Sequence, residues 1–384
     1  MVTPFLSDID QAGLFVGRVW NAKVQGPSVV TLRAGRVIDI TQKAAPMVRD
    51  ICEMPDPAAY VRAAHGQDLG AFAEISCVPA GDLSKTHFLA PCDLQSVKAC
   101  GVTFASSMVE RVIEERAAGN PAAAEEIRAR VGALIGDSLR DIKAGSAEAA
   151  AVKQALIKEG LWSQYLEVGI GPDAEVFSKA QVLSSMGPNA EVGLHPISKW
   201  NNPEPEIVLL VCSQGRILGA TLGNDVNLRD IEGRSALLLS KAKDNNASCA
   251  IGPMFRLFDA DYSIDDVHSA ELDLTVTGED GYVLSGHSSM KEISRAPADL
   301  VAQTLGRHHQ YPDGIVLFLG TLFAPTQDRD TPGEGFTHHL GDTVTISSKG
   351  LGSLTNTVRL STDCTDWTFG ISHLMRNLAK RDLL

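Results

Sequence analysis

Two apolar runs joined by a short turn, at residues 207–223, constrain the fold of this chain more than any other segment. The runs, IVLLVCS and RILGATLG, lie on either side of Gln214-Gly215, a pair that suits a tight turn between two strands. We therefore expect the runs to pair as an antiparallel hairpin. Apolar strands of this kind need further strands around them, so the segment predicts a β-rich domain.

The later part of the chain contains more strand patterns. Residues 271–288 alternate with period two and turn at Asp280-Gly281, residues 314–323 form a continuous apolar run, and residues 342–360 have the pattern of a final hairpin. The apolar run is expected to be buried. Residues 235–244 and 296–310 have helical patterns between these strands. Together they predict a β-rich catalytic domain with outer helices.

The first part of the chain has a different organisation. Short apolar runs separated by Gly and Pro over residues 12–41 predict a small antiparallel strand set, and residues 45–68 have a helical pattern. A proline interrupts the pattern near Leu89-Ala90-Pro91. We therefore predict an α+β protein, with a small N-terminal α/β domain over residues 1–90 and a catalytic domain over residues 91–384. Because no chemical motif occurs in the first ninety residues, we expect a structural or oligomer-contact role for them.

Residues 106–161 have a helical pattern. Met108, Val109, Val112 and Ile113 fall on one face, and the Glu and Arg residues opposite them are expected to be solvated. A break at Gly119-Asn120-Pro121 separates this helix from further helices expected over residues 122–142 and 147–166.

Bulk properties exclude several classes of function. Lys and Arg number 34 against 47 Asp and Glu, and the net charge of −13 argues against nucleic acid as the main partner. No run approaches the roughly 18 apolar residues of a membrane span, and the N-terminus has no basic region of a signal peptide. Seven cysteines without a CxxC pair indicate free thiols in a reducing compartment. We expect a cytoplasmic protein without a membrane or nucleic-acid partner.

Acidic residues border the central hairpin. Glu204 and Glu206 are two residues apart, so in a strand both side chains project to the same face. Two such anions repel each other unless a cation lies between them, and Asp225, after the second run, could supply a third oxygen. Oxygen ligands of this kind suit Mg²⁺. The alternative is a solvated acidic edge, which an isolated pair of this kind usually is.

Two more residues are candidates for proton transfer. Lys243 lies in a segment rich in amides and small residues, and a partly desolvated lysine beside a metal would have a lowered pKa and could act as a base. The alternatives are a surface lysine, or Lys241 in its place. Glu175 could be a fourth carboxylate or a surface residue. The pairs His308-His309 and His338-His339 lack metal-ligand spacing, so we expect polar surface or loop residues there.

The segments PEPEIVLLV and GNDVNLRD, followed by Lys243 six residues before the cysteine of ASCAIGP, resemble the fumarylacetoacetate hydrolase superfamily. The LGT at 319–321 and the closing GDTVTIS and GLGSLTN are also similar, and the resemblance covers roughly residues 89–384. It implies a mixed β-roll catalytic domain that binds Mg²⁺ or Mn²⁺. Its implied site residues are Glu204, Glu206 and Asp225 as metal ligands, Lys243 for proton transfer and Thr321 for the substrate carboxylate.

One departure from the family pattern bears on the reaction. The hydrolases of the family carry a segment like GLNYxxHxxE, whose His-Glu pair activates water, and the corresponding stretch here is GVTFASSMVE. Ser107 replaces the histidine and Glu110 stands in the glutamate position. A serine alone cannot serve as that base, which argues against hydrolysis and leaves Ser107 as a candidate substrate-binding residue.

Four segments carry a closer resemblance: LAPCDLQSVKACGVTFASSMVERVIEER, GLWSQYLEVGIGPDAEVFSKAQVLSSMG, WNNPEPE and TFGISHLMRNLA. They resemble one branch of the superfamily, the 2-keto-3-deoxy-D-xylonate dehydratases, with the arabinonate dehydratases as close neighbours. In that branch a glutamate lies 29 residues before the first metal ligand, the spacing of Glu175 from Glu204. The resemblance implies a hydro-lyase of non-phosphorylative pentose (D-xylose) catabolism, the Weimberg pathway. It would convert a 2-keto-3-deoxy sugar acid to 2-oxoglutarate semialdehyde and water, with Mg²⁺ as Lewis acid, Lys243 as base at C3 and Glu175 as acid at C4.

The resemblance also favours a homodimer or homotetramer. The alternatives are a 2-keto-3-deoxy-arabinonate dehydratase, a C–C hydrolase or decarboxylase of another 2-keto acid, and a non-catalytic module on the same scaffold. The sequence does not fix the stereochemistry at C4 of the substrate.

Overall fold

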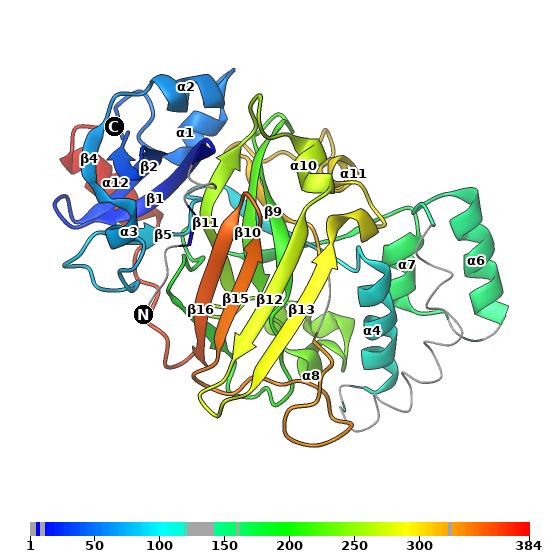
Figure 1. Cartoon of the computed structure of the whole chain (residues 1–384). Coiled ribbons are helices and arrows are strands. Elements are labelled where there is room, and N and C mark those ends of the chain that lie inside the picture. Colours follow the sequence, from blue (N-terminus) through cyan, green and yellow to red (C-terminus); the bar gives the residue numbers. More distant parts are fainter. Residues whose placement is uncertain are drawn as a thin grey trace.

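The protein is an α+β structure built on two β-sheets, as the computed structural model shows (Figure 1). The described residues are 5–7, 12–118, 120, 142–158, 160, 162–321 and 325–384. Within these residues, the larger sheet has eleven strands and the smaller sheet has five. The fold class predicted from the sequence is therefore confirmed.

The predicted central hairpin is present. Strands β9 (Pro205–Val211) and β10 (Ile217–Asp225) pair antiparallel, and Gly215 has a φ of +81° in the turn between them. A φ in this range is readily adopted only by glycine. Strand β9 is buried along its whole length, and β14 (Ile315–Phe318), the apolar run of the sequence, pairs with its other edge. The hairpin thus lies near the middle of the large sheet.

The large sheet has the strand order β4-β3-β2-β1-β11-β10-β9-β14-β6-β7, and β5 pairs with β1 beside this path. The pair β14–β6 is parallel and the others are antiparallel, so the sheet is mixed. Its remaining strands are β1 (Phe15–Asn21), β2 (Gly26–Arg33), β3 (Arg36–Asp39), β4 (Gln67–Ala71), β5 (His87–Leu89), β6 (Ser96–Gly101), β7 (Glu175–Ala180) and β11 (Cys249–Leu257).

The smaller sheet has the order β13-β12-β15-β16-β8 and contains the two other predicted hairpins. Alternate residues of β12, Leu272, Leu274 and Val276, are buried in a core that also includes residues of β9 and β10, as expected for a sheet with one face toward the core. Its strands are β8 (Glu191–Leu194), β12 (Glu271–Thr277), β13 (Val283–Ser289), β15 (Thr343–Ser348) and β16 (Gly352–Leu360).

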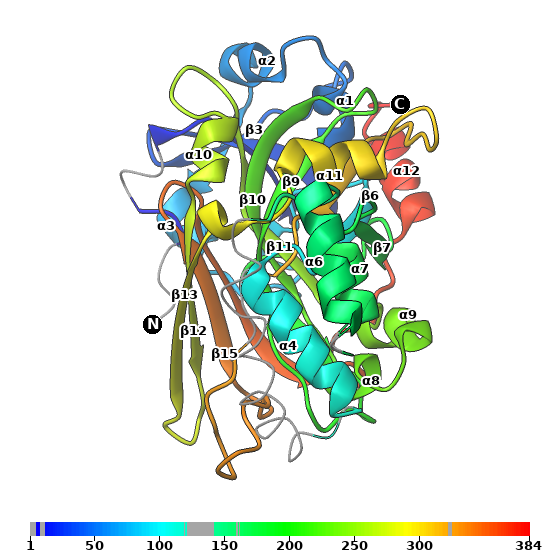
Figure 2. The same cartoon turned by 90° about the vertical axis from the view of Figure 1, so that its right-hand side faces the viewer.

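Helices cover the outside of the sheets, and Figure 2 looks onto α4, α6, α7 and α11 beside the large sheet. No helix among the described residues is long and apolar enough to cross a membrane. The helices are α1 (Val48–Cys52), α2 (Pro57–Ala63), α3 (Phe72–Ile75), α4 (Ala105–Arg116), α6 (Ala147–Lys158), α7 (Gln164–Ile170), α8 (Arg229–Glu232), α9 (Leu239–Lys243), α10 (Ile264–His268), α11 (Pro297–Thr304) and α12 (Ile371–Lys380), with 3-10 turns at Ala236–Leu238 and Met290–Glu292.

The N-terminal strands and helices form where the sequence predicted them, and they join the rest of the molecule in two ways. Strand β1 pairs with β11, so the N-terminal strands extend the large sheet. Helix α12, near the end of the chain, lies against this region (Figure 1), where the Asn377 side chain donates to the Val24 carbonyl over 3.1 Å. The boundary near residue 90 stays a prediction.

One expectation for the helical region was wrong at a single residue. The polar face of α4 was expected to be solvated, and Arg116 is exposed, but Arg111 is 5% exposed and forms ion pairs inside the molecule. The apolar face is as predicted, since Met108, Val112 and Ile113 are buried. The helix expected over residues 122–142 lies outside the described residues except for its last position.

Candidate active site

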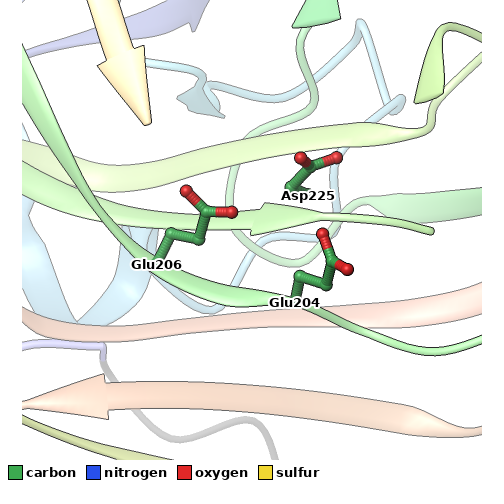
Figure 3. A group of neighbouring side chains, drawn as sticks. All are labelled: Glu204, Glu206 and Asp225. Carbon is green, nitrogen blue, oxygen red and sulfur yellow. The ribbon is translucent and has the colours of Figure 1, made fainter. Parts of the chain in front are cut away.

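The register of the central hairpin brings the three acidic residues together. The backbone N–H of Asp225 donates to the carbonyl of Glu204 over 3.0 Å, and Glu206 lies two positions further along β9 on the same face. One carboxylate oxygen of each of the three residues lies within 4.8 Å of the corresponding oxygens of the other two (Figure 3). The three residues are between 1% and 2% exposed. The alternative of a solvated acidic edge is therefore wrong.

A separate donor holds one oxygen of each carboxylate. The Arg111 guanidinium donates to Oε1 of Glu204. The backbone N–H of Gly320 donates to Oε2 of Glu206 over 2.7 Å. The Lys179 ammonium lies 2.8 Å from Oδ1 of Asp225. These contacts fix the orientation of the carboxylates, since each has its second oxygen toward the others or toward the pocket.

Lys243, the last residue of α9, lies directly beside the acidic group. Its ammonium donates to Oε2 of Glu204 and lies 3.3 Å from Oδ2 of Asp225, and the residue is 2% exposed. Burial lowers the pKa of Lys243, but Asp225 and Glu204 raise it more, so its pKa lies above the usual value. The lowered pKa expected from the sequence is therefore not produced by the protein's own groups. Lys241, the competing candidate, is exposed.

Strand β7 presents three side chains to the site at alternate positions, Glu175, Phe177 and Lys179. Glu175 and Phe177 line the pocket, and the ring centre of Phe177 lies 5.8 Å from the Lys243 ammonium. Lys179 has no exposed surface, and its ammonium donates to the carbonyls of Val226 and Lys243 as well as contacting Asp225. This lysine therefore links β7 to Asp225 and to the end of α9.

The Glu175 carboxyl has a different environment from the three acidic residues. Burial and, less strongly, the nearby Glu232 raise the pKa of Glu175 to about 7, against the lowering effect of Arg111. Glu175 is opposite Gly101 in the pairing of β7 with β6, and a Cβ at Gly101 would lie 1.9 Å from Oε2 of Glu175. The Glu175 carboxyl can occupy this position because residue 101 has no side chain.

Three charged residues of the site, Arg111, Lys179 and Glu232, were not found by sequence reasoning. Arg111 bridges two carboxylates, because its other terminal nitrogen lies 3.1 Å from Oε2 of Glu232. Glu232, the last residue of α8, is 4% exposed. The sequence offered one usable signal, the alternation of Glu175 and Lys179 along a strand that begins with a candidate acid.

The pocket is lined by residues of strands β6, β7 and β10 of the large sheet, of helices α4, α8 and α9 and of adjoining segments, and Thr321 is among them. The lining residues are Cys100, Gly101, Val102, Arg111, Glu175, Phe177, Glu204, Asp225, Glu232, Lys243 and Thr321.

Of the other residues named from the sequence, Ser107 belongs to the first turn of α4, but its side chain lies outside the described part of the structure. His308 and His309 are exposed, while His338 is buried and its Nδ1 lies 3.1 Å from Oδ2 of Asp342, away from the lining residues.

The donor set fits a divalent cation. Burial raises the pKa of Glu206 well above its usual value, and Asp225 and Glu204 raise it further, which reflects the cost of placing three anions together. With every group ionised, five carboxylates lie at or beside the pocket against three cations, and a bound cation would reduce this excess of negative charge. The carboxylates are Glu175, Glu204, Glu206, Asp225 and Glu232, and the cations are Arg111, Lys179 and Lys243.

The sequence is similar to a known protein family and to known dehydratases. Residues 175–359 match the family model of the fumarylacetoacetate hydrolase C-terminal domain. A probable 2-keto-3-deoxyxylonate dehydratase of Haloferax volcanii is 29% identical over 279 residues, which is 72% of this chain and 87% of that protein. A 2-dehydro-3-deoxy-D-arabinonate dehydratase of Saccharolobus solfataricus is 29% identical over 185 residues, 48% of this chain and 58% of that protein.

Solved structures show the same fold. One is a 2-keto-3-deoxy-D-arabinonate dehydratase complexed with magnesium and 2,5-dioxopentanoate. Its alignment covers 90% of this chain and 98% of the dehydratase chain, with a TM-score of 0.60 and 19% identity. The alignment with a fumarylacetoacetate hydrolase of Exiguobacterium antarcticum covers 90% of this chain and 99% of the hydrolase chain, with a TM-score of 0.54 and 16% identity. The β-roll architecture predicted from the sequence is confirmed by these likenesses.

Proposed function

We propose that this chain is a Mg²⁺-dependent dehydratase of a 2-keto-3-deoxypentonate, of the fumarylacetoacetate hydrolase superfamily whose C-terminal domain model matches residues 175–359. The products would be 2-oxoglutarate semialdehyde (2,5-dioxopentanoate) and water. Similarity to proteins named as dehydratases of such acids supports the proposal, as does a related structure that holds magnesium and 2,5-dioxopentanoate.

One observation carries the proposal: the pocket is lined by Glu204 and Asp225 of the buried three-carboxylate group, by a lysine that contacts both of them and by a protonatable carboxyl. A non-catalytic module would have no use for so many desolvated charges. The combination also matches the needs of water loss from a 2-keto acid, which requires a base at C3 and an acid at C4.

We propose that Glu204, Glu206 and Asp225 hold the cation, which supplies Lewis acidity at the keto group and whose charge favours the neutral form of Lys243. Lys243 then accepts a proton from C3. The bond from C4 to its hydroxyl breaks, and Glu175 donates a proton so that the hydroxyl leaves as water.

Glu175 suits the acid role because its pKa of about 7 keeps much of it protonated near neutral pH. Thr321 stands at the pocket wall, where it can bind the substrate carboxylate.

The two relatives' names describe one substrate if both belong to the D-series. Xylonate and arabinonate differ in configuration only at C2 and C3, and in the 2-keto-3-deoxy acid C2 is a ketone and C3 a methylene. The remaining stereocentre, C4, is the same for both D-acids. The open question of stereochemistry is therefore D against L at C4.

The experiment is turnover of the D and L forms of 2-keto-3-deoxypentonate by purified protein with and without Mg²⁺, with the product identified by mass and by aldehyde trapping. We expect Mg²⁺-dependent loss of water and formation of the semialdehyde. Acylpyruvates and oxaloacetate serve as the comparison substrates. Cleavage or decarboxylation of these acids without dehydration of either pentonate would contradict the proposal and favour a C–C hydrolase or decarboxylase.

Several finer assignments remain part of this proposal. Mn²⁺ suits the same oxygen ligands and is expected to substitute for Mg²⁺. A homo-oligomeric state, a cytoplasmic location and a place in D-xylose catabolism stay predictions, as does a substrate-binding role for Ser107.

A further inference from the structure

The pocket contains a second carboxyl group that the loss of water does not use. Glu232, at the end of α8, is 4% exposed and lines the same pocket as Glu175 and Lys243. It is not part of the three-carboxylate group. A buried carboxylate beside a reaction that already has its base and its acid calls for a separate chemical role.

Glu175 and Glu232, the two pocket carboxyl groups outside the three-carboxylate group, have different surroundings. Glu232 lies 3.1 Å from the Arg111 guanidinium, which holds its carboxyl group at the pocket wall. Burial and the charge of Glu232 raise the pKa of Glu175 to about 7, which favours the form that donates a proton. Carboxyl pairs whose environments differ in this way are the usual arrangement for an acid and a base in one site.

The proposed product requires one more proton transfer than the loss of water. Removal of a C3 proton and the C4 hydroxyl leaves a double bond between C3 and C4, conjugated with the keto group, and a CH₂OH group at C5. The semialdehyde has its second carbonyl at C5. Reaching it requires that a proton leave C5 and that the double bond move away from C3, steps for which Lys243 and Glu175 alone do not account.

We infer that Glu232 is a second catalytic base, which removes a proton from C5 of the enone and so carries the isomerisation to the semialdehyde. This inference rests on the proposed dehydratase function. As Glu232 takes the C5 proton, the double bond moves to C4 and C5, and C3 takes back the proton that Lys243 had accepted. The resulting C5 enol gains the Glu232 proton at C4 and loses its hydroxyl proton, which restores Glu175. No oxidant or co-reactant is required.

The test uses Glu232→Gln, which keeps the shape of the side chain and removes the base. Its matched control is Asp230→Asn on the same short helix, because Asp230 accepts hydrogen bonds from Ser198 and Lys199, each over 2.8 Å, and does not line the pocket. Each protein is given Mg²⁺ and either the 2-keto-3-deoxypentonate or the synthetic 5-hydroxy enone. Absorbance of the conjugated enone and trapping of the aldehyde separate the two isomeric products.

We expect Glu232→Gln to slow conversion of the enone by about 10²–10⁴-fold, the usual effect of losing a general base, so that the enone accumulates from the pentonate. Wild type and Asp230→Asn should yield the aldehyde without accumulation of the enone. Aldehyde formation at the wild-type rate by Glu232→Gln, or release of the enone by wild type, would overturn the inference. A wild type that isomerises the enone but does not dehydrate the pentonate would instead contradict the proposed function alone.

If Glu232→Gln does not fold, Glu232→Asp decides the question. The shorter carboxylate is expected to slow isomerisation of the enone more than release of water from the pentonate. Equal slowing of both steps would assign Glu232 a structural role and overturn the inference.

Discussion

Replacement of Glu175 by glutamine is expected to make the protein more stable above neutral pH, in addition to removing its activity. Burial raises the pKa of Glu175 from 4.5 to about 7, and Glu232 contributes to the rise. At about 1.4 kcal/mol for each pKa unit, this difference corresponds to about 3 kcal/mol between the two protonation states. Glutamine has nearly the same shape and does not ionise.

The sign follows from proton binding in the two states. Below pH 4.5 the carboxyl is protonated in both the folded and the unfolded chain. Between pH 4.5 and about 7 only the unfolded chain loses the proton, so the stabilising contribution of Glu175 falls as the pH rises and is lost above its folded pKa. The free energy of unfolding of Glu175→Gln, relative to wild type, should therefore increase by about 2.5 kcal/mol between roughly pH 5 and pH 8.

The assay is urea unfolding of both proteins followed by tryptophan fluorescence, at the two pH values and in the presence of a chelator. Groups that titrate alike in both proteins cancel in the difference. Glu279→Gln, at an exposed position, is the control and should stay parallel to wild type. If the free energy of unfolding of Glu175→Gln changes between the two pH values by the same amount as that of wild type, within about 0.5 kcal/mol, the raised pKa assigned to Glu175 is refuted.

Other perturbations test the remaining parts of the site. Lys243→Ala should lower kcat by about 10²–10⁴-fold with folding intact by circular dichroism, and near-wild-type turnover would exclude it as the base. Lys179→Met leaves the buried Asp225 carboxylate without one partner and should cost about 3–5 kcal/mol in urea unfolding; a loss under about 1 kcal/mol would contradict its linking role. Gly101→Ala should displace the Glu175 carboxyl and lower kcat up to about 100-fold, and an unchanged kcat would contradict the contact. A chelator should abolish turnover and added Mg²⁺ restore it; activity that persists would exclude the metal.

The parts of the fold that the sequence predicted well are those set by local patterns. The hairpin at residues 207–223 follows from two apolar runs and a glycine with positive φ, and its register is enough to place Asp225 beside Glu204. Period-two alternation likewise predicts β12 and its pairing with β13. Such contacts join residues close in sequence, so their geometry is largely fixed by strand and turn preferences.

The charged residues that complete the site depend on distant contacts. Arg111 reaches Glu204 across 93 residues of sequence, and Lys179 reaches the Lys243 carbonyl across 64. On an amphipathic helix, an arginine opposite the apolar face normally contacts water, and nothing local distinguishes Arg111 from its solvated neighbours. The raised pKa of Lys243 among the protein's own groups likewise depends on distant contacts, since it comes from carboxylates brought near by β9 and β10.

The buried charges indicate why this pocket is a functional site and not a means of stabilising the fold. Replacing a buried ion pair by well-packed apolar residues is often neutral or stabilising, so the group around Glu204 costs more than a purely structural core would. Apolar residues at these positions would continue the hydrophobic pattern of β9 and β10 without interruption. The expected gain in stability on replacing Glu175, together with loss of turnover, would measure that cost directly. A gain without loss of turnover would mean that the Glu175 carboxyl is not required for the reaction.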